Sequence, residues 1–311
     1  MDLWIESLVE RPRASTRRSV AIGNFDGVHL GHARLLRVCV DEGRRRGLVP
    51  TALTFDPHPG SVVSHRGAPP VISTLTSRRR RLAEIGIEDL AHFRFDLTTA
   101  RLTPAEFVDQ ALVDGVHCGC VVVGEGFRFG AGREGDVATL RTLSEGRFDT
   151  LEVPTLEEGG ERVSSSRIRD ALLEGNLREA ERFLGRPYEI EGLVVHGDHR
   201  GRLIGFPTAN IDLEGVSALR LGVYAADGFI DGESARRAAV NLGLRPTFEG
   251  SEPRLEAHFP GFNGDLYGRT VRLVFLARLR DEGRFDSMED LKAQLREDVR
   301  RVQAAAGSGA S

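Results

Sequence analysis

Short apolar runs alternate with helical patterns through the first half of the chain. The runs predict buried strands at residues 20–22, 49–55, 91–95, 121–123 and 151–153. The helical pattern after the first run carries an apolar stripe as far as Val40 and ends at Gly47, a residue type that commonly terminates helices. Strands that alternate with helices predict a parallel sheet covered by helices on both faces.

Several helix starts are marked by capping residues. Thr103 precedes Pro104 and is followed three residues later by Glu106, which predicts a capping box. Further helices are predicted at residues 77–86, from the serines of 163–169 as far as 175, at 176–185 and from 287 onward, with a frayed tail at 304–311. The arginine row at 78–81 is interpreted as a solvated helix face.

The second half of the chain has a different pattern. Apolar runs separated by Gly and Asp turns predict strands at residues 188–195, 222–226, 228–230, 238–242, 255–259 and 270–279. Many short strands of this kind predict an antiparallel barrel. We therefore expect an α/β chain of two domains: a Rossmann-like parallel-sheet domain at residues 1–184, and a β-barrel domain with a terminal helix at 185–311.

Composition and charge exclude some classes of protein. The 311 residues carry a net charge of −4, which argues against a general nucleic-acid or membrane-surface binder. No apolar run approaches the roughly 18 residues of a membrane helix, and the acidic N-terminus does not resemble a signal peptide. Three cysteines without framework spacing predict a reducing, cytoplasmic location. The thiols within residues 117–120 suggest a metal site, but beside a strand they are interpreted as core side chains.

The stretch from Ser19 to Gly47 carries the most specific chemistry. Its pattern is strand, glycine loop and helix, a geometry that aims backbone N–H groups at a phosphate. His29 and His32 lie three residues apart at the helix start, so both imidazoles can face one anion. The pattern is neither the P-loop, which needs a lysine (the single lysine here is Lys292), nor the G-x-G-x-x-G dinucleotide motif. Two surface histidines and a pair of metal ligands remain open as alternatives.

A second candidate for anion binding is V-S-S-S-R-I-R at residues 163–169. Serine hydroxyls, helix N–H groups and guanidinium groups all favour a phosphate. Serines at a helix start also act as ordinary caps, and this alternative stays open. The loops after the first, second and fourth predicted strands are expected to meet at one edge of the sheet, where parallel sheets bind ligands.

Motifs in both halves resemble, in the same order, those of the bacterial bifunctional riboflavin kinase/FMN adenylyltransferases, also called FAD synthetases. In the first half they are G-N-F-D-G-V-H-L-G-H at 23–32, T-F-D-P-H-P at 54–59, G-E-G-F-R-F-G at 124–130 and S-S-S-R-I-R at 164–169. In the second half they are G-R-L-I-G-F-P-T-A-N at 201–210, N-L-G-L-R-P-T-F at 241–248, L-E-A-H at 255–258, D-L-Y-G at 265–268 and R-D-E-G-R-F at 280–285. The resemblance therefore covers nearly the whole chain.

The resemblance implies two reactions that use ATP. The second half would phosphorylate the 5′-hydroxyl of riboflavin to give FMN. The first half would join AMP to FMN, giving FAD and pyrophosphate. ATP, riboflavin, FMN and FAD are the expected partners, with Mg²⁺ accompanying ATP and no tightly bound cofactor. The oligomeric state does not follow from the sequence.

The resemblance also implies roles for individual residues. Glu256 matches the general base of the kinase half, and Thr208 and Asn210 match its Mg²⁺ ligands. Contacts of this half with ATP and flavin are expected from Gly201, Arg202, Gly205, Pro207 and Asn241. The catalytic residues of the adenylylating half are expected to be His29, His32 and Arg169. Its ATP contacts are expected from Gly23, Phe25, Asp26, Gly31, Ser165, Ser166 and Arg167, and its flavin contacts from Asp56, Pro57, Phe127 and Phe129.

Two positions depart from the family pattern. Gly126 stands where the family has Asp or Asn, so we expect reduced FAD formation or altered flavin selectivity. Ser166 replaces a threonine and keeps the hydroxyl. Three alternative functions remain: a riboflavin kinase with a weakened or merely nucleotide-binding first half, a paralogue acting on a flavin analogue or another small alcohol, and a non-enzymatic flavin-binding protein.

Overall fold

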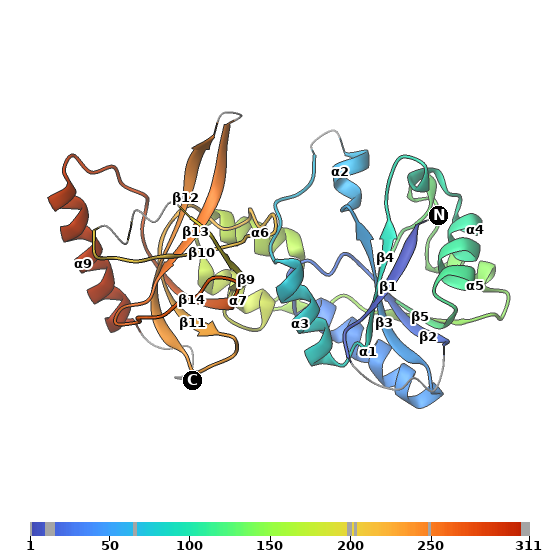
Figure 1. Cartoon of the computed structure of the whole chain (residues 1–311). Helices are drawn as coiled ribbons and strands as arrows, with labels where there is room; N and C mark the ends of the chain where they lie inside the picture. Colours follow the sequence, from blue (N-terminus) through green and yellow to red (C-terminus); the bar gives the residue numbers. More distant parts are fainter. Residues whose placement is uncertain are drawn as a thin grey trace. The chain divides into compact units, whose positions relative to one another are not determined.

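The computed structural model describes residues 2–9, 16–64, 67–197, 201, 204–247 and 250–305. The chain divides into two compact units. Unit 1 comprises Met1–Pro69 and Arg78–Ser164, and unit 2 comprises Pro70–Ser77 and Ser165–Ser311. Figure 1 labels the helices and strands of both units.

Unit 1 is built on a six-stranded sheet with the order β1-β4-β3-β2-β5-β6. Its strands are β1 (Leu3–Ser7), β2 (Arg18–Ile22), β3 (Val49–Asp56), β4 (Asp89–Arg94), β5 (Cys118–Gly124) and β6 (Asp149–Val153). The predicted parallel sheet is confirmed, because β2 to β6 pair in parallel. The antiparallel edge strand β1 was not predicted, since it is short and Glu6 interrupts its apolar positions.

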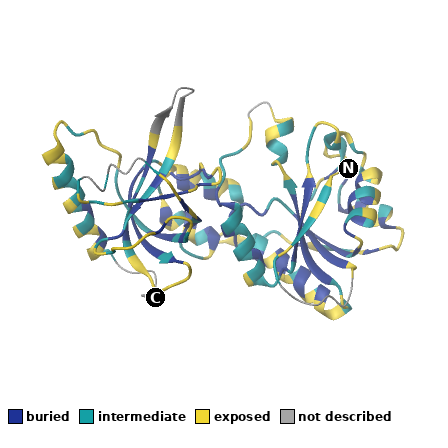
Figure 2. Ribbon diagram, viewed as in Figure 1, coloured by how far each residue is buried: buried dark blue, intermediate teal, exposed yellow. Residues whose placement is uncertain are grey.

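Unit 1 contains the helices α1 (Leu30–Arg46), α2 (Pro59–Val63), α4 (Pro104–Phe107), its wider π-type continuation η2 (Val108–Gly115) and α5 (Val137–Ser144). It also contains all but the first three residues of α3 (Leu75–Ile85). Two single turns, η1 (Thr99–Arg101) and η3 (Ala131–Arg133), and a hairpin of β7 (Glu157–Glu158) and β8 (Glu161–Arg162) complete the unit. Figure 2 shows the sheet as mostly buried. The central strand β2 is buried at every position, as expected for a parallel strand covered on both faces.

The capping predictions are confirmed by the hydrogen bonds of the helix ends. The Thr103 hydroxyl accepts from the Glu106 backbone while the Glu106 carboxylate accepts from the Thr103 backbone, which is a capping box. Helix α1 ends at Gly47 in the left-handed conformation. Asn176 and Ser287 also act as caps, because each side chain accepts a backbone N–H three residues on.

The arginine row in α3 is neutralised by carboxylates of unit 1. Arg80 and Arg81 pair with Glu84 at 2.6 and 2.8 Å, and Arg79 pairs with Glu6 on β1. All four arginines are half-buried, and Arg78 pairs with the buried Asp26 carboxylate, so the row is only in part the solvated face that the sequence suggested.

Unit 2 is built on a closed antiparallel barrel with the order β10-β13-β12-β11-β14-β9. Its strands are β9 (Glu189–Val195), β10 (Ala209–Ile211), β11 (Gly222–Ile230), β12 (Arg236–Thr247), β13 (Gly250–His258) and β14 (Thr270–Arg280). The barrel is confirmed, but the two strands predicted at 222–226 and 228–230 are the single strand β11. Asp227, which suggested a turn, lies inside β11 because its carboxylate pairs with Arg237 on β12 at 2.7 Å.

Helices α6 (Ser165–Glu174), α7 (Leu177–Leu184) and α9 (Met288–Ala304) complete unit 2. The terminal helix α9 packs against β11 and β12, so the predicted packing helix is confirmed. It extends to Ala304, and residues 306–311 of the predicted frayed tail lie outside the described residues.

The short segment Pro70–Ser77 of the first half belongs to unit 2. Val71 forms a parallel β-bridge with Val216, and the Tyr188 hydroxyl donates to the carbonyl of Ile72 at 2.8 Å. The two compact units therefore interleave along the sequence. The predicted boundary between the two functional domains, 1–184 and 185–311, stays a prediction.

The cysteines are core side chains. Cys39, Cys118 and Cys120 are unpaired and buried, and the last two lie in β5. Within the described ranges, no cluster of three His, Cys, Asp or Glu side chains is arranged to hold a metal.

Candidate active sites

The loop after β2 turns the chain sharply before α1. Phe25 and Val28 adopt positive φ angles of 51° and 40°, a conformation that costs such residues about 1–3 kcal/mol each. The Phe25 ring is fully buried and lies edge-on to His32, with centroids 5.3 Å apart. Backbone strain of this kind clusters at functional sites, where packing enforces a particular loop shape.

His29 and His32 stack face to face at the start of α1. Their ring centroids are 3.6 Å apart and the planes differ by 12°. His29 caps the helix, because its Nδ1 accepts the backbone N–H of His32 at 3.1 Å. Since Nδ1 accepts, the proton of the neutral His29 ring sits on Nε2, which is a donor. The structure thus brings the two predicted imidazoles together and orients one of them through the backbone.

Gly31 makes room for this stack. A Cβ at Gly31 would lie 3.1 Å from Cε1 and 3.2 Å from Nδ1 of His29. These distances are tighter than ordinary van der Waals contact, so a side chain at Gly31 would require the His29 imidazole to shift by a few tenths of an ångström.

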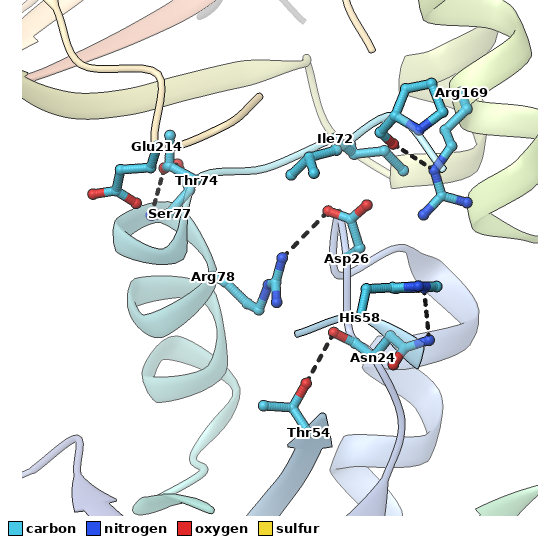
Figure 3. Close-up of polar contacts among 12 residues, drawn as sticks. Asn24, Asp26, Thr54, His58, Ile72, Thr74, Ser77, Arg78, Arg169 and Glu214 are labelled. Carbon is cyan, nitrogen blue, oxygen red and sulfur yellow. Dashed lines mark hydrogen bonds and ion pairs between the residues drawn. The ribbon is translucent and has the colours of Figure 1, made fainter. Parts of the chain in front are cut away.

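Three contacts tie the histidine loop to its neighbours in unit 1, as Figure 3 shows. The buried Asp26 carboxylate pairs with Nη2 of Arg78 at 3.5 Å. The Asn24 amide lies 3.0 Å from Nε2 of His58, and the Thr54 hydroxyl donates to the Asn24 carbonyl at 3.3 Å. The loops after β2 and β3 are therefore joined at the carboxyl edge of the sheet, where the sequence placed them.

The predicted flavin residues of unit 1 differ in exposure. Asp56 and Pro57 are exposed at the end of β3. Phe127 is half-buried and stacks on Phe129 with centroids 5.6 Å apart. Phe129 is itself buried against Phe107 in the core, so it packs between Phe107 and Phe127 and offers little surface of its own for a flavin.

Gly126, the departure from the family pattern, has space for a larger residue. Its φ is 74°, and a Cβ there would meet nothing within 4 Å. Among residues other than glycine, Asp and Asn tolerate this backbone region best. The backbone therefore still suits the residue types that the family has at this position.

The predicted pyrophosphate residues lie in unit 2, at the first turn of α6. Ser165 and Ser166 begin this helix, where N–H groups without intrahelical partners favour an anion. Arg167 is exposed, and Nε of Arg169 donates to the Pro70 carbonyl at 2.7 Å. The histidine pair belongs to unit 1, so the predicted adenylylation residues divide between the two units.

Three predicted kinase residues form one row across the barrel. Asn210 on β10 is in register with Glu256 on β13, which is in register with Asn241 on β12. Residues directly opposite one another in antiparallel strands share a face of the sheet. The neighbouring positions Ala209 and Ala257 are buried in the barrel interior, so the row lies on the outer face.

The row contains a cation that sequence reasoning missed. Nε of Arg254 donates to Oδ1 of Asn210 at 2.5 Å and lies 3.3 Å from Oε1 of Glu256. Glu256 is accordingly half-buried and paired, not an exposed strand carboxylate. The period-two spacing of Arg254 and Glu256 along a strand was the available signal, since it puts both side chains on one face.

A cavity of about 670 Å³ is lined by residues of β9, β10 and β13 and by the loop after β13. Thr208 and Pro207 contribute to its wall, together with Phe259 and Tyr267. The Tyr267 ring stacks on His196 with centroids 4.1 Å apart. The volume lies within the range of small-molecule and cofactor pockets.

The glycines of the loop before β10 lie in a tight turn. The Phe206 N–H donates to the Gly201 carbonyl at 2.9 Å, and Gly205 stands at the corner with a φ of 86°. The predicted contact Arg202 lies outside the described residues.

Two family models match the chain. Residues 11–167 match the model for FAD synthetase, and residues 184–306 match the model for riboflavin kinase. The chain is 42% identical over 280 residues to the bifunctional riboflavin kinase/FMN adenylyltransferase of Escherichia coli (strain K12), covering 90% of each protein. It is 34% identical over 284 residues to the protein of that name from Bacillus subtilis (strain 168), covering 90% of this chain and 89% of that protein. The chain belongs to the bifunctional riboflavin kinase/FMN adenylyltransferase family.

A solved structure supports the fold of this riboflavin kinase/FMN adenylyltransferase. It is the crystal structure titled macrolide-efflux protein from Streptococcus pneumoniae, with a TM-score of 0.77 and 33% identity, covering 94% of this chain and 96% of that one. The FAD synthetase match contains the loop with His29 and His32 and also Ser165 to Arg167. The riboflavin kinase match contains the row of Asn210, Glu256 and Asn241. In the part of the chain that the structure describes, no helix is both long enough and apolar enough to cross a membrane.

Proposed function

We propose that the barrel converts riboflavin to FMN, that the parallel-sheet domain converts FMN to FAD, and that ATP is the co-substrate of both reactions. Family membership supports the two activities. The observation that carries the assignment of residues is the register of Asn210, Glu256 and Asn241, which sets a carboxylate between two amides on one face of the barrel.

In the kinase reaction, Glu256 accepts the proton of the riboflavin 5′-hydroxyl as that oxygen attacks the γ-phosphorus of ATP. The new O–P bond forms, the bond from the γ-phosphorus to the bridging oxygen breaks, and ADP leaves. The cavity lined by Thr208 and Pro207 supports a small-molecule pocket beside these strands. Ala209 and Ala257 also line it, so it lies on the other face of β10 and β13 from Asn210 and Glu256. We assign Asn241 and the turn at Gly201 and Gly205 to contacts with the same substrates.

Thr208 and Asn210 suit a Mg²⁺ ion that arrives with the nucleotide. Their hydroxyl and amide oxygens are hard donors, and Mg²⁺ in such enzymes takes few protein ligands and completes its shell with phosphates and water. The described residues hold no three-carboxylate or three-histidine cluster that would make a closed protein cage. When bound there, the ion supplies charge neutralisation for the phosphate oxygens.

Adenylylation of FMN needs little proton transfer, because the FMN phosphate is already an anion at neutral pH. A phosphate oxygen of FMN attacks the α-phosphorus of ATP, and pyrophosphate leaves. We assign His29 and His32 to the charge that develops on the α-phosphate, and Ser165, Ser166 and Arg169 to the pyrophosphate. The Nε2 proton that the cap geometry places on His29 supports this role.

The remaining assignments follow from exposure. Phe127, Asp56 and Pro57 offer surface for the FMN to be adenylylated. The open space at Gly126 favours a looser hold on that flavin than the family's Asp or Asn would give. Three unpaired buried thiols support a reducing, cytoplasmic location.

Incubation of the purified chain with riboflavin, ATP and Mg²⁺, followed by chromatography of the flavins, tests the proposal. FMN followed by FAD is the expected result. FMN alone would restrict the first half to nucleotide binding. If neither FMN nor FAD formed, the remaining functions would be catalysis on a flavin analogue or flavin binding without catalysis.

A further inference from the structure

Arg254 lies on β13 two residues before Glu256, beside the row formed by Asn210, Glu256 and Asn241. Its guanidinium contacts both the amide oxygen of Asn210 and the carboxylate of Glu256, and its side chain is 22% exposed. It also packs over the backbone directly after β9, because a Cβ at Gly197 would collide with the guanidinium and with the Asn210 amide. This packing gives the arginine one well-defined position.

The opposite flank of Arg254 is shaped by a glycine. Gly243 on β12 is the register partner of Arg254, and the Glu282 carboxylate occupies the space that a Cβ at Gly243 would take. Arg254 therefore stands on a face that carries carboxylates from β13 and from the loop after β14. A cation here balances charge as well as bridging two side chains.

We propose that Arg254 is a positioning residue of the kinase site, holding the Glu256 carboxylate beside Asn210 so that the base is in place before riboflavin and ATP bind. The inference rests on the proposed role of Glu256 as that base. A planar guanidinium presents donors at fixed angles and can hold two acceptors at once, which a flexible ammonium does not. Such placement matters, because an error of roughly 1 Å in a catalytic group costs about 100-fold in rate.

The same contacts are also compatible with a different role, in which Arg254 competes with the Mg²⁺ that accompanies ATP. The change in Mg·nucleotide binding when Arg254 is removed distinguishes the two roles. If Arg254 only occupied the metal position, its removal would tighten binding of Mg·nucleotide, since like charges repel. If it positions the base, its removal lowers turnover and does not tighten nucleotide binding.

Two substitutions and one matched control test the proposal. Arg254→Met keeps the apolar stem and removes every donor, whereas Arg254→Lys keeps the charge and removes the fork. Arg237→Met is the control, because Arg237 also pairs with a carboxylate between barrel strands, that of Asp227, but lies outside the row. Riboflavin phosphorylation, FMN adenylylation and calorimetric binding of Mg·ADP are measured on the full chain, with thermal unfolding of each variant.

We expect Arg254→Met to lower kcat for riboflavin phosphorylation by about 10- to 100-fold. FMN adenylylation should stay within about twofold, and the binding of Mg·ADP should not become tighter. Arg254→Lys should recover only part of the loss, and Arg237→Met should keep the wild-type kcat. On a Glu256→Gln background, Arg254→Met should cost nothing further, because the two residues act as one unit.

Other outcomes overturn the inference. Tighter binding of Mg·ADP with unchanged kcat would make Arg254 a competitor of the metal. Full additivity of Arg254→Met with Glu256→Gln would show that it does not act through the base. A fully active Glu256→Gln variant would remove the proposed base itself. A strongly impaired but measurable Glu256→Gln variant beside a fully active Arg254→Met variant would overturn only the positioning role of Arg254.

Discussion

The guanidinium of Arg280 forms a bidentate ion pair with the carboxylate of Asp298, which is 1% exposed. Nε lies 3.0 Å from Oδ1 and Nη2 lies 2.7 Å from Oδ2, and Gln294 donates to the same carboxylate at 2.9 Å. The pair joins the end of β14 to α9, and Glu282 lies in the loop directly after Arg280. The terminal helix therefore anchors a loop that borders the kinase row.

Asp298→Ala is expected to destabilise the barrel by about 3–5 kcal/mol, because it leaves a partly buried cation without its partner. A urea titration resolves the two units spectroscopically. The single tryptophan, Trp4, lies in unit 1, and the three tyrosines lie in unit 2: Tyr188, Tyr224 and Tyr267. Tyrosine circular dichroism should therefore report the lower stability of unit 2, while the unfolding transition of unit 1, seen by tryptophan fluorescence, stays near that of the wild type.

Glu297→Ala is the control for this prediction. It removes an exposed ion pair with Arg300 at 2.5 Å on the same helix, which is expected to change stability by less than about 1 kcal/mol. Equal losses in the two variants would contradict an anchoring role for Asp298.

Gly31→Ala is expected to lower FMN adenylylation by up to about 10-fold, because the new Cβ forces the stacked imidazole of His29 to shift slightly. Riboflavin phosphorylation by the same polypeptide should keep its rate and serves as the internal control. Both rates are read from one assay by separating FMN from FAD. Unchanged FAD formation would show that the stacked position of His29 is not the active one.

Gly126→Asp is expected to raise the rate of FAD formation from FMN. The left-handed backbone at Gly126 accepts Asp at little cost, and the site has open space around it. Initial rates at several FMN concentrations test the change, which should appear mainly in KM for FMN. Identical rates for the two proteins would mean that the glycine costs the enzyme nothing.

The three thiols are expected to resist alkylation in the native protein at pH 8. Burial raises the pKa of Cys39 and of Cys118 to about 12, and burial also raises the pKa of Cys120. Because a raised pKa keeps a thiol protonated and the thiolate is the nucleophile, reaction should begin only on unfolding and then consume all three. Rapid labelling of any one thiol in the folded enzyme would contradict the buried positions.

Features with local causes could be predicted from the sequence. Thr103 with Glu106 marks a helix start because both partners of the box lie within one turn, and Gly47 marks a stop because the backbone there is left-handed. Features set by pairing across the fold could not. Asp227 indicates a turn by itself, and only Arg237 on the neighbouring strand explains its place inside β11.

The candidate sites divide in the same way. His29 and His32 follow from their spacing, but the stack and the tautomer depend on the cap and on Gly31. Glu256 and Asn210 follow from motifs that lie far apart in sequence, whereas Arg254 becomes visible only once β10 and β13 are in register.

The central claim is that one polypeptide holds two independent ATP-dependent sites that act in succession on one vitamin. The most direct measurement is a crossed assay of Glu256→Gln and of the double variant His29→Asn, His32→Asn, each given riboflavin or FMN with ATP and Mg²⁺. We predict that Glu256→Gln forms FMN from riboflavin at least about 100-fold more slowly but still makes FAD from FMN, and that the histidine variant makes FMN and no FAD. Loss of both activities in either well-folded variant, or loss of neither, would contradict the account.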